Sequence, residues 1–113
     1  LSLRALAAPD AMYANAVLEK IERIGTLNYP IDARGKRGDK LLATLVIRPD
    51  GSLARFEIDR PAENRIFNAS AERIARLAAP FPKVPAEVLD GWEVVTITRW
   101  WSFTSEDVRT SAN

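Results

Sequence analysis

A predicted β-hairpin limits the folds open to this chain more than any other feature of its sequence. Two segments, Lys40–Arg48 and Leu53–Asp59, carry apolar side chains at alternate positions, as half-buried strands do. Between them, Pro49–Ser52 reads Pro-Asp-Gly-Ser, in which proline presets φ and glycine supplies a positive φ. The pattern predicts two antiparallel strands with one face turned toward a core. The predicted inward side chains are Leu41, Ala43, Leu45, Ile47, Ala54, Phe56 and Ile58.

Helical periodicity appears on both sides of this hairpin. Apolar side chains recur at spacings of three and four, which predicts a helix from Asp10 to Ile24 that Gly25 caps at its C-terminus. A second helix is predicted to begin at Asn68 or Ser70 and to end before the next proline. Its predicted inner face consists of Phe67, Ala71, Ile74, Ala75 and Ala78.

The last strand signal lies near the end of the chain. Trp92–Phe103 is the longest run of β-forming residues, and the polar segment 105–113 after it is expected to be disordered. Phe81, held between two prolines before this strand, is expected to be buried. The predicted fold class is α+β in the order helix-strand-strand-helix-strand, with a three-stranded antiparallel sheet and two helices on one face. The expected domain spans 10–104, after a flexible tail at 1–9.

The residue types that are missing limit the chemistry. The chain of 113 residues contains neither Cys nor His. Their absence excludes nearly every structural zinc site and the Ser-His-Asp and Cys-His catalytic arrangements. A formal net charge of +1 is too small to gather nucleic acid or an anionic membrane surface. We therefore expect one domain that is not an enzyme, holds no cofactor or metal and binds no nucleic acid.

Two polar clusters are better explained as solvated surface than as sites. Glu57 and Asp59 on the second strand, and the acidic pair flanking Gly91, leave a route to acid–base catalysis. No predicted cleft encloses either pair, so we interpret them as solvated charges. The segment Gly35–Lys40 superficially suggests a phosphate-binding loop, but it precedes a strand, whereas phosphate sites lie before a helix.

Several short motifs follow one another in a fixed order between Tyr13 and Phe103. They are Tyr29-Pro30 with Ala33-Arg34, then Pro49-Asp50-Gly51, Ala71 and Ile74, Ala79-Pro80-Phe81 with Pro85, and Ile97, Trp101 and Phe103. None of these is specific alone. Their order and spacing together resemble the C-terminal domain of the TonB family.

This resemblance implies the periplasmic domain of an inner-membrane-anchored energy transducer in a Gram-negative bacterium. Such domains bind the box peptide of outer-membrane TonB-dependent transporters by strand addition. They transmit mechanical work derived from the proton-motive force for the uptake of iron chelates, vitamin B12 or similar cargo. The implied partners are the transporter and, through a preceding part of the protein, the ExbB/ExbD complex. A proline-rich linker and one membrane helix are expected before Leu1.

Two segments are candidate partner-binding sites. If the last strand lies at the edge of the sheet, an extended peptide can pair with it. The candidate residues on that strand are Thr96, Thr98, Arg99, Trp100 and Ser102, whereas Ile97, Trp101 and Phe103 are interpreted as core. The resemblance adds the segment before Pro30, namely Thr26, Leu27, Asn28 and Tyr29.

The residues of this second segment, Thr26–Tyr29, differ in how well a purely structural role explains them. Tyr29 taken alone is better explained as a core anchor. The side chains of Thr26 and Asn28 are polar, and such groups can satisfy the outward amides of an added strand.

Two other function classes remain open at this point. A TolA-like or secretion-system scaffold domain would share the helix-and-hairpin architecture, and a small nucleic-acid binder is disfavoured by the charge. The sequence also leaves open whether the domain is a monomer or a strand-exchanged homodimer.

Overall fold

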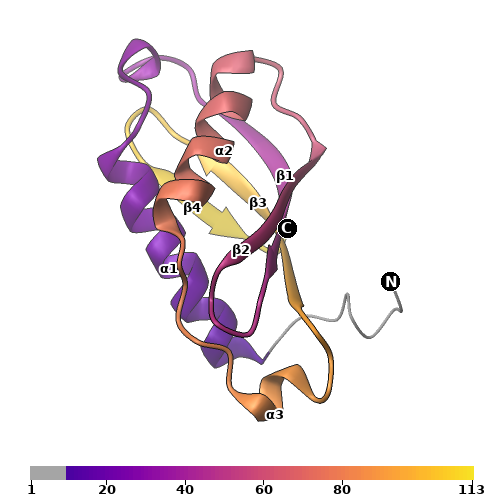
Figure 1. Cartoon of the computed structure of the whole chain (residues 1–113). Coiled ribbons are helices and arrows are strands. Elements are labelled where there is room, and N and C mark those ends of the chain that lie inside the picture. Colours follow the sequence, from indigo (N-terminus) through magenta and orange to yellow (C-terminus); the bar gives the residue numbers. More distant parts are fainter. Residues whose placement is uncertain (1–9) are drawn as a thin grey trace.

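The computed structural model describes residues 10–113, so the tail expected at 1–9 lies outside the described residues. The elements in chain order are α1 (Ala11–Leu27), η2 (Ile31–Ala33), β1 (Asp39–Ile47), β2 (Leu53–Arg60), α2 (Arg65–Ala78), α3 (Ala86–Leu89), β3 (Val95–Phe103) and β4 (Val108–Ser111). The described strands form one antiparallel sheet in the order β2-β1-β3-β4. Helices α1 and α2 lie next to each other on one face of this sheet (Figure 1). The α+β class and the helix placement are confirmed.

The number of strands is the main correction. The sequence predicts three strands and a disordered segment 105–113, but Val108–Ser111 pairs with Trp100–Phe103 as a fourth strand. The turn between them is closed by the Thr104 N–H, which donates to the Asp107 carbonyl at 2.9 Å. Val108 is only 2% exposed, and its burial against α1 anchors a strand whose other side chains are polar.

The β1–β2 hairpin forms as predicted, and its turn is fixed to the connection that leaves α2. Gly51 adopts the predicted positive φ, 91°. The Phe81 N–H donates to the Gly51 carbonyl at 2.8 Å. A Cβ on Gly51 would lie 2.0 Å from the Phe81 carbonyl oxygen, so only glycine fits this contact. Phe81 itself is 4% exposed, which confirms its predicted burial.

Helix α1 begins as predicted but runs past Gly25. The Asp10 carboxylate accepts from the Tyr13 N–H at 2.9 Å at the N-terminus. At the other end Asn28 is the C-cap, and its Nδ2 donates to the Ile24 carbonyl at 2.8 Å. The predicted capping role of Gly25 is therefore wrong. Glycine there allows the close approach of β4, because a Cβ would lie 2.9 Å from Cγ2 of Val108 and would force that side chain to shift.

Helix α2 begins earlier than predicted. Asn64 is its N-cap and accepts from the Ile66 N–H at 3.1 Å. Asn68, one of the two predicted caps, lies inside the helix and instead forms two hydrogen bonds with the backbone of Ala62, at 2.8 and 3.0 Å. The helix therefore begins at Arg65 because an asparagine upstream of the predicted caps supplies the first acceptor.

The core lies between the sheet and the two helices, and aromatic rings fill much of it. Tyr29 is 2% exposed, and its ring centroid lies 5.9 Å from that of Phe103 and 6.3 Å from that of Phe67. Trp101 packs against Phe56 from β2, with centroids 5.5 Å apart. The predicted core placement of Ile97, Trp101 and Phe103 is confirmed. In the described part of the chain no helix has the length and apolar character that a membrane span needs.

Candidate functional site

The outer edge of β3 is divided into two halves. Trp100–Phe103 pairs with β4, whereas Val95–Arg99 pairs with β1 on one side and with no described strand on the other. The sequence places the last strand at the edge of the sheet, and this is wrong for Trp100–Phe103. The chain itself supplies the neighbouring strand there, and this strand, β4, ends opposite Trp100.

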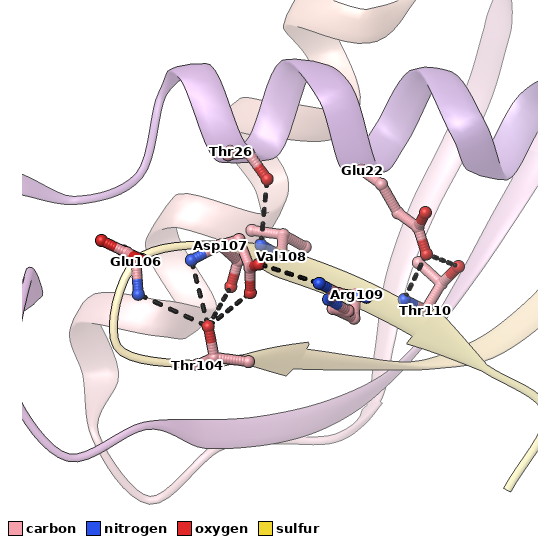
Figure 2. Close-up of polar contacts among 8 residues, drawn as sticks. All are labelled: Glu22, Thr26, Thr104, Glu106, Asp107, Val108, Arg109 and Thr110. Atoms are coloured by element: carbon pink, nitrogen blue, oxygen red, sulfur yellow. Dashed lines mark hydrogen bonds and ion pairs between the residues drawn. The ribbon is translucent and has the colours of Figure 1, made fainter.

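Helix α1 closes the outer edge of β4 with two side chains (Figure 2). The Val108 N–H donates to Oγ1 of Thr26 at 3.2 Å. The Thr110 N–H donates to Oε2 of Glu22 at 2.7 Å, and the Thr110 hydroxyl donates to the same oxygen at 2.8 Å. Both outward amides of this short strand therefore have acceptors within the domain, so an incoming strand would find neither of them vacant.

These contacts also show which backbone groups of β3 point outward. Because the amides of Val108 and Thr110 point away from β3, the backbone groups of Arg109 and Ser111 point toward it. Their partners on β3 are Ser102 and Trp100. Backbone direction alternates along a strand, so Thr98 presents its N–H and C=O on the same side as Trp100, beyond the end of β4.

A side chain already uses one of the outward groups of Thr98. Nη1 of Arg99 donates to the Thr98 carbonyl at 2.8 Å. This bond supports the backbone direction deduced from the β4 register. A guanidinium on a long side chain is an exchangeable partner, because rotation of the side chain releases the carbonyl.

Of the predicted residues on β3, Arg99 lies on the side of the sheet that faces α1, and the other four share the opposite face. Thr98 is exposed on the face opposite the helices, Ser102 is half-buried, and Thr96 is 3% exposed. Trp100 is half-buried and lies beneath the Lys40 ammonium, with Nζ 4.9 Å from the ring centroid. This cation–π contact explains how an aromatic ring is held on that face.

The side chain of Thr98 belongs to a chain of hydroxyl contacts across the sheet. Its Oγ1 lies 2.7 Å from Oγ1 of Thr44 on β1. The Thr44 hydroxyl in turn donates to Oδ2 of Asp59 on β2 at 2.6 Å. Sequence reasoning treated Asp59 as a solvated charge and did not connect it with Thr98, because no pattern within one strand reveals a contact across three strands.

The segment Thr26–Tyr29 lies beside β4 and not beside the half of β3 that extends beyond β4. Thr26 satisfies an outward amide, as expected of a site residue, but it does so for the domain's own β4. Leu27 is 73% exposed, and Asn28 caps α1. Tyr29 is a core residue whose hydroxyl donates to the Thr104 carbonyl. Burial, aided by Asp107, raises the pKa of Tyr29.

A groove lies between α1 and the end of β4, next to the half of β3 that extends beyond β4. Its volume is about 310 Å³. It is lined by Asn15, Leu18, Glu19, Glu22, Arg99, Thr110, Ser111 and Ala112. Arg99 and Glu22 thus face the same groove, and sequence reasoning missed Glu22. The available signal was its spacing of four residues from Thr26, which places both side chains on one face of α1.

Comparisons with known proteins agree with this architecture. The family model described as "TonB C terminal" matches residues 10–98. A solution NMR structure of TolAIII bound to a peptide derived from the N-terminus of TolB has a similar fold, with a TM-score of 0.55. Its sequence is 16% identical, and the match covers 81% of this chain and 74% of that chain. No curated protein matches this chain by sequence. Because the family model covers most of the chain, the protein belongs to the TonB C-terminal family and is a periplasmic domain of that type.

Proposed function

We propose that the domain binds an extended segment of an envelope protein by adding it as a strand along Val95–Arg99 of β3. The observation that carries this proposal is the end of β4 opposite Trp100, which leaves outward backbone groups of Thr98 beyond the paired region. An added strand would continue the line of β4 along the same edge. The groove between α1 and β4 lies where alternate side chains of that strand would enter.

Binding exchanges one hydrogen bond for another at Thr98. A backbone N–H of the added strand takes the place of the Arg99 guanidinium on the Thr98 carbonyl. The short segment of β3 beyond the end of β4 offers only a few such bonds, each contributing roughly 1 kcal/mol net. Ordering the peptide costs about 2–5 kcal/mol. We therefore expect micromolar or weaker affinity, which tethering within the envelope would reinforce.

The proposed biological role is that of a TonB-type energy transducer. The partner segment is then the box peptide of an outer-membrane transporter for iron chelates or similar cargo. Energy derived from the proton-motive force arrives through inner-membrane anchoring and the ExbB/ExbD complex, and the domain has no catalytic chemistry of its own. Tension parallel to an added strand loads all its backbone bonds together, so a weak complex can carry force briefly.

An NMR titration of the domain with a synthetic box peptide tests this proposal. We expect amide shifts centred on Thr98 and Arg99, together with Asn15 and Glu19 at the groove. The partner-binding candidates Trp100 and Ser102 should respond through their side chains, since their backbone groups already pair with β4. Shifts confined to the loop around Lys36, or no shifts at millimolar peptide, would reject strand addition at this edge.

A TolA-like scaffold role is the second candidate, favoured by the similarity in fold to TolAIII, which was solved with a TolB-derived peptide. In that role the domain would hold an envelope complex together without moving cargo. Parallel titrations with a box peptide and with an N-terminal TolB peptide separate the two functions. Tighter binding of the box peptide supports the transducer, and tighter binding of the TolB peptide supports the scaffold.

A further inference from the structure

The chain of contacts Thr98–Thr44–Asp59 has a fixed hydrogen-bond direction. An ionised carboxylate can only accept, so the proton between Thr44 and Asp59, whose oxygens are 2.6 Å apart, belongs to Thr44. A hydroxyl has one proton, and that of Thr44 is used in this bond. The 2.7 Å contact between Thr44 and Thr98 therefore requires Thr98 to donate its own proton inward.

This direction determines what Thr98 offers to a bound strand. With its proton committed to Thr44, the Thr98 hydroxyl presents only lone pairs to any group placed beside it. A residue opposite Thr98 in an added strand would project its side chain on the same face of the sheet, with Cβ atoms about 4.5–5.5 Å apart. That separation allows a short side chain to reach the Thr98 oxygen.

We infer that Thr98, with its hydroxyl oriented by Asp59 through Thr44, selects peptides that carry a hydrogen-bond donor at the position opposite it. The inference rests on the proposed strand addition and adds the chemical class of one partner side chain. Asp59 acts as a positioning residue. It lies two strands away from the added peptide, so it influences the choice only through the orientation of the two hydroxyls.

Peptides that differ only in donor capacity test the inference. Cross-strand NOEs in the wild-type complex identify the peptide position opposite Thr98. Three versions of the peptide then carry threonine, O-methylthreonine or valine there. O-methylthreonine keeps the side-chain oxygen but lacks the proton. We expect the threonine peptide to bind about five-fold more tightly than either of the others, as one hydrogen bond would provide.

Three variants of the domain show whether the hydroxyl chain causes this preference. Asp59→Asn supplies an amide that can donate to Thr44, so Thr44 can donate to Thr98 and the proton of Thr98 is free to point outward. The preference for the threonine peptide over the other two should then fall below about two-fold. Thr44→Val interrupts the chain and should have the same effect. Glu57→Gln is the matched control, because it removes a charge from the same strand outside the chain, where Glu57 pairs with Arg55 at 2.8 Å. It should retain the full preference.

The possible outcomes separate this inference from the proposed function. Equal binding of all three peptides at the β3 edge would overturn the donor preference and leave strand addition in place. A preference unchanged by Asp59→Asn, or reduced equally by Glu57→Gln, would overturn the role of the hydroxyl chain. Failure of every peptide to bind would overturn both proposals.

Discussion

The two halves of the outer edge of β3 satisfy their outward backbone groups in different ways. Along Trp100–Phe103 the edge is occupied by β4, and the amides on the far side of β4 are bound by Thr26 and Glu22. Along Val95–Arg99 no described strand takes that place, and the exposed carbonyl of Thr98 is covered by Arg99 from its own strand. One half is sealed by two side chains from a packed helix and the other by a single side chain from β3 itself.

This difference explains how a small sheet can accept a strand at one place without pairing everywhere. An open edge is a template for unwanted association as well as for binding. At β4 an incoming strand would have to displace three hydrogen bonds made by two side chains of α1, Thr26 and Glu22. At Thr98 it would have to displace one hydrogen bond, from the Arg99 guanidinium to the carbonyl. The edge at β4 is therefore protected by more hydrogen bonds than the edge at Thr98.

The largest expected effect is on stability, and it should differ between proline substitutions at inward and at outward amides of β3. The N–H of Ile97 points toward β1, so Ile97→Pro should remove a ladder bond and a core side chain and cost at least about 3 kcal/mol. The N–H of Thr98 points outward, so Thr98→Pro should change stability by no more than about 1 kcal/mol while abolishing peptide binding. Urea melts and peptide titrations measure the two effects. Unfolding of the Thr98 variant would show that its amide points into the sheet.

The next effect concerns the contact that holds β4 on α1. Gly25→Val should force Val108 away from the helix, because even a Cβ would lie 2.9 Å from its Cγ2. We expect a loss of about 1–3 kcal/mol and rapid hydrogen exchange across Val108–Ser111. Met12→Val is the control, since it adds the same side chain to α1 at a position that is 84% exposed. Gly25→Val raises helix propensity whereas Met12→Val lowers it, so equal destabilisation by both variants would contradict the contact with Val108 as the cause.

A smaller effect should follow from removing one acceptor of the β4 edge. Glu22→Ala leaves the Thr110 amide without its partner and should cost about 1–2 kcal/mol. The Thr110 amide should then exchange faster, and the opened edge should favour self-association in sedimentation experiments. Glu19→Ala changes a neighbouring acid on the same helix and should alter neither property. A monomeric Glu22 variant with a protected Thr110 amide would contradict the proposed sealing role.

The smallest effect is a pH dependence at the β3–β4 turn. The hydrogen bond from the Thr104 hydroxyl, with help from Arg109, lowers the pKa of Asp107 below its usual 3.8. A lowered folded-state pKa gives stability that is present above about pH 4 and lost as the pH falls through the folded value. The difference in melting temperature between wild type and Asp107→Asn should therefore shrink between pH 5 and about pH 2. A difference that stays constant over this range would exclude the carboxylate as its source.

The elements that could be predicted are those with local signals. The β1–β2 hairpin follows from alternation and turn residues, and the inner face of α2 follows from its periodicity. Strand β4 carries no such signal, because Val108 is its only buried side chain and the acceptors for its amides come from a helix more than eighty residues earlier. The predicted capping role of Gly25 is wrong for the same reason. This glycine allows β4 to approach α1, and it does not end its own helix.

The candidate site was predictable as a strand but not as an edge of limited length. Outward parity correctly grouped Thr98 with Trp100, yet only the register of β4 shows that their backbone groups have different partners. The hydroxyl chain from Thr98 to Asp59 depends on the order of three strands, which residue patterns do not encode.

The contact between Gly51 and Phe81 has a consequence for how sequences of this fold can diverge. The turn of the first hairpin and the exit from α2 meet through main-chain atoms, at Phe81 N–H to Gly51 carbonyl and at Val84 N–H to Pro49 carbonyl. No side chain mediates these bonds, so they depend on the spacing of the two loops, and an inserted residue on either side would disturb both. We expect natural variants of this domain to keep the lengths of these two loops, the glycine at Gly51 and apolar residues at the buried positions of Phe81 and Val84, while the exposed side chains of the loops change.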